Sequence, residues 1–157
     1  MNEDVKIKWV KGLFIGTESV LSSIFGVLYI PVLLMVACNV LDYITGLIAA
    51  KYREDGGISS YKSMKGIFKK VSMWLLVVVG SIIDTLIKYS VNTFGWEWPL
   101  SFIVAAVVAV WIICNEIISI LENITDIGVS VPRFLMPLVK NIKRKTEDVI
   151  PDQEEEE

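Results

Sequence analysis

Three acidic residues, Asp42, Asp84 and Glu116, lie inside apolar stretches of the sequence, where charges are rare. Paired carboxylates can act as general acid and base, and Glu122 follows Glu116 six residues later. On a helix this spacing turns the two side chains about 120° apart, away from a shared face. The chain has no histidine to complete a nucleophile pair or an imidazole metal site. We therefore expect no enzymatic activity, no cofactor and no metal.

The composition favours a membrane protein. Of the 157 residues 54% are hydrophobic, and the mean hydropathy is +0.57. Six of the 18 acidic residues fall in the last ten positions, so the rest of the chain has 15 basic and 12 acidic residues. Such a basic excess suits contact with anionic lipid, and we expect no nucleic acid partner. Cys38 and Cys114 lie in apolar runs, where packing is favoured over a disulfide.

Long uncharged runs predict the membrane-spanning elements. Residues 19–41 and 98–115 contain no charge, and residues 71–87 contain only Asp84. A helix of roughly 20 residues crosses about 30 Å of hydrocarbon. Gly26 and Pro31 divide the first run. The sequence predicts an all-α integral membrane protein whose membrane domain, residues 31–128, has three spans at about 31–52, 71–88 and 98–124.

The segments outside the spans are amphipathic or acidic. Residues 1–30 combine lysines with apolar side chains and predict a helix, up to about Phe25, that lies in the membrane interface. A plain extension of the first span is the alternative. Residues 129–147 predict a short basic amphipathic helix on the membrane surface. Residues 148–157 predict an acidic, disordered tail.

The distribution of basic residues predicts the orientation. Residues 51–70 hold six basic and two acidic side chains, whereas residues 88–98 hold one of each. The positive-inside rule places the first loop and the basic C-terminal segment in the cytoplasm. Trp96 and Trp98 are expected at the outer boundary. The lysines expected to contact lipid headgroups and fix the topology are Lys62, Lys65, Lys69 and Lys70.

Small and polar residues recur every three to four positions along one side of each predicted span. Such a side favours helix association or contact with water. We expect the three acids to be neutral or paired when packed, with Asp84 bound to Lys88. A compact monomeric bundle and a self-associating assembly both remain open. The predicted pore or oligomer-interface residues are Asn39, Asp42, Gly46, Asp84, Asn115, Glu116, Ser119, Glu122 and Asn123.

The order of these motifs resembles the bacteriophage holin family that includes the clostridial toxin-secretion holins. The similarity covers about residues 40–135, and no single motif is specific by itself. The residues that carry it are, in order, Asp42-Tyr43-x-Thr45-Gly46 with Ala50, Lys65-Gly66-Ile67-Phe68-Lys69-Lys70, Asp84, Asn115-Glu116-x-x-Ser119-Ile120-x-Glu122-Asn123, and Gly128 with Pro132.

The resemblance implies a small phage protein that oligomerises in the host bacterial cytoplasmic membrane and opens pores or lesions. An endolysin, or a toxin, would pass through them. The alternative is a small homo-oligomeric ion or solute channel not linked to lysis, and the size of the leaked solute separates the two. The next methionine after Met1 is Met35, so we expect any antiholin to be a separate protein.

Overall fold

The structure, a computed structural model, describes residues 3–53, 60–95 and 103–149. Within these ranges the chain is helical and has no strand, which confirms the predicted all-α class. Three helical segments, Gly26–Tyr52, Met64–Phe94 and Ile103–Asp126, are long and apolar enough to cross a membrane. The helices are α1 (Glu3–Phe25), α2 (Tyr29–Tyr52), α3 (Ser60–Phe94), α4 (Ile103–Asp126) and α5 (Leu135–Glu147), with a 3₁₀ turn at Gly26–Leu28.

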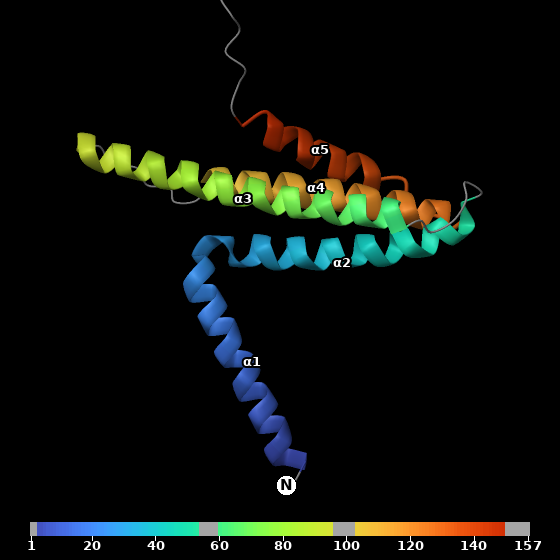
Figure 1. The fold of residues 1–157 in the computed structure, drawn as a ribbon, viewed down its shortest axis with the longest axis horizontal. Helices are drawn as coiled ribbons and strands as arrows, with labels where there is room; N and C mark the ends of the chain where they lie inside the picture. Colours follow the sequence, from blue (N-terminus) through green and yellow to red (C-terminus); the bar gives the residue numbers. More distant parts are fainter. Residues whose placement is uncertain (1–2, 54–59, 96–102, 150–157) are drawn as a thin grey trace, which may run out of the picture.

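The chain changes direction between α1 and α2. Gly26 has a φ of +51°, a conformation that glycine adopts without steric cost. Helix α1 ends at Phe25, where the sequence predicts its end, and leaves the other helices at an angle (Figure 1). Pro31 lies in the first turn of α2, where its missing N–H breaks no hydrogen bond. The location of α1 in the membrane interface stays a prediction.

Helix α3 is longer than the predicted span 71–88. It runs over 35 residues, or about 52 Å, and so exceeds the thickness of the hydrocarbon layer. The lysine-rich segment before residue 71 contains good helix formers and no proline, so the helix continues through it. Trp96, Trp98 and the start of the predicted third span lie outside the described residues.

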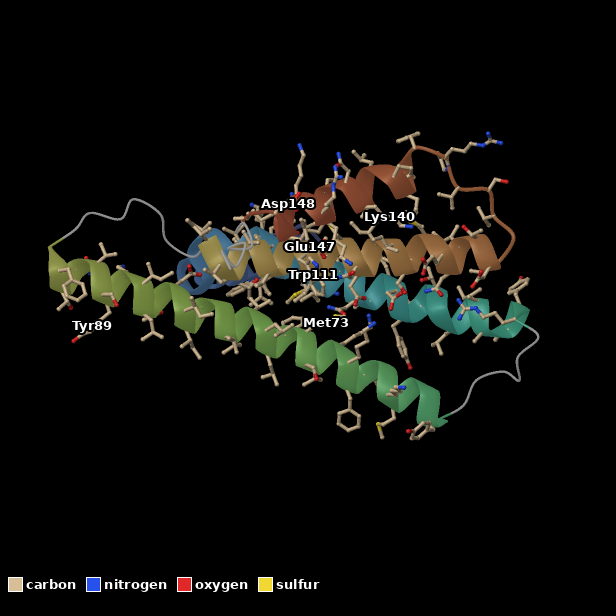
Figure 2. All side chains as sticks on the ribbon, turned by 90° about the horizontal axis from the view of Figure 1, so that it is seen from above. Met73, Tyr89, Trp111, Lys140, Glu147 and Asp148 are labelled. Carbon is tan, nitrogen blue, oxygen red and sulfur yellow. The ribbon has the colours of Figure 1, made fainter. Side chains whose placement is uncertain are left out.

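Helix α4 is the centre of the bundle. It packs against α2, α3 and α5 (Figures 1 and 2). The outward sides of α2 and α3 expose large apolar residues, as expected for contact with lipid. The buried core contains Met35 of α2, Met73 and Val77 of α3, and Ala105, Ala109 and Ile112 of α4.

Helix α5 folds back along α4. After α4, Gly128 adopts a φ of +92°, and the N–H of Val129 donates to the Ile124 carbonyl at 3.2 Å. This C-terminal cap reverses the chain, and α5 runs antiparallel to α4 (Figure 1). The amphipathic helix is therefore present, but it packs on α4, which differs from the expected position flat on the membrane.

Candidate functional site: a polar cluster between the spans

Lys70 of α3 joins the other two spans. Its ammonium donates to Asp42 Oδ2 of α2 at 2.8 Å and to the Glu116 carboxylate of α4. Glu116 is only 4% exposed, and the Asp42 and Lys70 side chains are largely buried. One cation therefore binds two carboxylates from two other helices.

The position of Lys70 differs from the headgroup contact that the sequence predicts. Because α3 begins at Ser60, Lys70 is already its eleventh residue, and its side chain is directed toward α2 and α4. Two carboxylates in an apolar interior attract the nearest cation, which removes part of their desolvation cost. Lys65 and Lys69 are exposed, and the side chain of Lys62 lies outside what the structure describes.

A second part of the cluster extends toward the C-terminal end of α4. The Asn123 side-chain amide donates to Asp42 Oδ1 at 3.1 Å and to the Thr45 hydroxyl at 3.3 Å. Arg53 donates to Asn123 Oδ1 at 3.0 Å and to Asp126 Oδ2 at 2.7 Å. Asp42 thus belongs to both parts, so polar contacts run without a break from Lys70 to Asp126.

Three members of this network, Thr45, Arg53 and Asp126, are absent from the predicted site. All three belong to the polar stripes on α2 and α4, so the periodicity carried a signal for them. Gly46 lies beside the network, since a Cβ atom there would be 3.6 Å from Asn123 Nδ2.

Asp84 has a different partner from the one predicted. Its carboxylate accepts the backbone N–H groups of Val104 and Ala105 at 3.0 and 2.9 Å. Among the described residues no ion pair joins it to Lys88. The first N–H groups of a helix have no partner within the helix and attract an anion. Asp84 therefore caps α4 from a neighbouring helix.

The other predicted residues remain outside the cluster. Asn39 and Asn115 each donate to the backbone carbonyl four residues earlier. In the part of the chain that the structure describes, Asn39 Oδ1 is buried without a hydrogen-bond partner. Ser119 is half-buried and Glu122 is exposed, so Glu122 does not join Glu116.

Ion pairs of the cluster join the three spans to one another. Two cations, Lys70 and Arg53, bind three carboxylates. Removing Lys70 would leave the largely buried carboxylates of Asp42 and Glu116 without their cation, whereas the side chains of Arg53 and Asp126 are 43% and 40% exposed. Separation of the helices would expose the charges of Lys70, Asp42 and Glu116 to water. The structure shows the packed arrangement, in which these charges are paired.

The chain is similar to known proteins of one family. The model described as the bacteriophage holin family matches residues 19–144. An uncharacterized protein of Listeria innocua is 34% identical over 134 residues, which cover 85% of this chain and 86% of that protein. A probable holin of Bacillus phage phi105 is 32% identical over 103 residues, with 65% and 66% covered. No solved structure shows a significant match.

Proposed function

This chain belongs to the bacteriophage holin family, and from that premise we propose that it forms lesions in the cytoplasmic membrane of a host bacterium. Copies of the chain accumulate, associate through their polar sides and then separate their helices around water. An endolysin made in the cytoplasm leaves through the opening and reaches the cell wall.

The observation that carries this proposal is the ionic cluster of Asp42, Lys70 and Glu116 inside helices whose outer sides are apolar. Charged groups within spans are expensive, by roughly 2.5 to 3.5 kcal/mol each on insertion scales, and commonly mark a path for water or ions. A purely structural bundle of this size needs no such groups. Hydration of the cluster would supply the polar surface that a water-filled lesion requires.

The proposed orientation places the Lys51 to Lys70 segment and the C-terminus in the cytoplasm. It rests on the excess of basic residues in these segments. In this orientation the Arg53–Asp126 pair lies toward the cytoplasmic side, and the Asp84 cap lies toward the outer side.

Induced expression in a bacterium tests this function. Membrane potential, viability and culture turbidity are followed with and without a co-expressed cytoplasmic endolysin. We expect the membrane potential to collapse in both cultures, and lysis to follow only where the endolysin is present. A culture that expresses the endolysin alone is the control and should not lyse. Collapse of the potential without lysis would instead support a channel for small solutes.

A further inference from the structure

The end of α5 lies beside an apolar part of α4. Trp111 is the ninth residue of α4 and belongs to the uncharged run 98–115. Its Nε1 donates to Glu147 Oε1 of α5 at 2.7 Å, and Lys143 Nζ lies 5.1 Å from the centre of its ring. Figure 2 shows Trp111, Glu147 and Asp148 close to one another at this end of α5.

This packing places several exposed charges beside the apolar part of α4. Lys140, Arg144, Lys145, Glu147 and Asp148 are all exposed. Each cation in hydrocarbon would cost roughly 2.5 to 3.5 kcal/mol. Acyl chains therefore do not fit against this side of the α4–α5 pair.

The exposed sides of α3 and α5 differ clearly in composition. The outer side of α3 exposes Leu75, Val78 and Ile82, without a charge in that stretch. On α5, Lys140 and Arg144 lie on one side, whereas the exposed apolar side chains of Leu138 and Ile142 lie on another side, which also carries Lys145. Helix α5 thus suits a boundary between a wet and an apolar surface.

We propose that α5 is a re-entrant arm that remains on α4 within the membrane, and that the exposed, charged side of this α4–α5 pair borders the water-filled space of the assembled lesion. The inference rests on the proposed function, because it adds the α4–α5 side of the subunit to the polar cluster as a surface that faces that water. The outer sides of α2 and α3 then face lipid.

A disulfide test uses the native Cys114. It lies one turn after Trp111 on α4, and Lys143 lies one turn before Glu147 on the antiparallel α5, so we expect the two positions to oppose each other. In a Cys38→Ser background, Lys143→Cys should form an intramolecular disulfide with Cys114 in isolated membranes under mild oxidation. Arg144→Cys, which lies on the exposed side of α5, is the matched control and should not.

The protein locked by this disulfide then tests whether the α4–α5 side borders water. In the locked protein, a charged maleimide should modify an added Asp148→Cys and leave an added Leu75→Cys unmodified. The locked protein should still release endolysin. Failure of the disulfide to form, an unmodified Asp148→Cys, or activity restored only by reduction would each overturn the proposal. If the reduced and unsubstituted proteins are also inactive in release, the proposed function fails, while disulfide formation and labelling still decide the position of α5.

Discussion

At the scale of single residues, charge pairing across helices explains most of the cluster. Lys70 is the only cation bound to Asp42 and Glu116 among the described residues, so the three groups depend on one another. The sequence predicts which carboxylates lie within the spans. It does not predict their partners, because a periodic stripe defines a side of a helix but not the axial offset between two helices. Asp84 illustrates this, since its partners belong to α4 and not to its own helix.

Replacement of Lys70 tests this dependence. Lys70→Met leaves two buried carboxylates without their cation, and loss of one partner of a buried pair costs about 3 to 5 kcal/mol. Thermal unfolding of the purified protein in detergent should show a clear fall in the midpoint. Lys69→Met is the matched control, since Lys69 is exposed, and its midpoint should stay near that of the unsubstituted protein. Equal midpoints for the two variants would show that the ion pairs add no stability.

Replacement of Asp84 tests the cap. Asp84→Ala removes the acceptor for the Val104 and Ala105 N–H groups and should cost about 1 kcal/mol, as for other helix caps. Amide hydrogen exchange should accelerate in the first turn of α4 and stay unchanged near Asn123. Uniform acceleration along α4 would contradict a local capping role.

At the scale of helices, close packing fixes where α3 crosses α4. A Cβ atom on Gly80 would lie 2.8 Å from Ala105 Cα, whereas a Cβ on Gly66 would meet no atom of the described residues within 4 Å. Both glycines are in α3, and the sequence alone does not indicate which of them lies at a close contact with another helix. The uncharged runs predict the three spans, but the position of α5 could not be predicted, since lipid and the α4 surface satisfy the same amphipathic pattern.

The two glycines form a matched pair for mutation. Gly80→Ala should destabilise the α3–α4 contact by about 1 to 3 kcal/mol, the usual range for overpacking. Gly66→Ala should be neutral, or stabilising by up to about 1 kcal/mol, because alanine favours the helix. The two variants are compared by their midpoints of thermal unfolding in detergent. A lower midpoint for Gly66→Ala than for Gly80→Ala would contradict the observed crossing.

At the scale of the whole molecule, the proposed function depends on the orientation of the chain and on its assembly. The family membership and the three spans make this a multi-pass membrane protein. The polar cluster lies between helices whose outer sides are apolar, so a single copy hides its charges. Only many copies together can enclose a space wide enough for a folded protein. Solute size therefore separates the proposed lesion from a small channel.

Cysteine labelling tests the orientation. In a Cys38→Ser, Cys114→Ser background, a reagent that cannot cross the membrane should label Thr93→Cys in intact cells before lesions form, and should not label Ser60→Cys. The expected pattern follows from the basic excess between Lys51 and Lys70. The opposite pattern would mean that the chain is inverted and that its C-terminus is outside.

Lesion formation by this protein is tested by the release of solutes of graded size from vesicles that contain the purified protein. The vesicles enclose a small dye and a fluorescent dextran as large as a folded enzyme, and protein-free vesicles are the control. We predict that both solutes escape once the protein exceeds a threshold density in the bilayer. Escape of the dye alone at every density would contradict a lesion-forming protein and support a small channel.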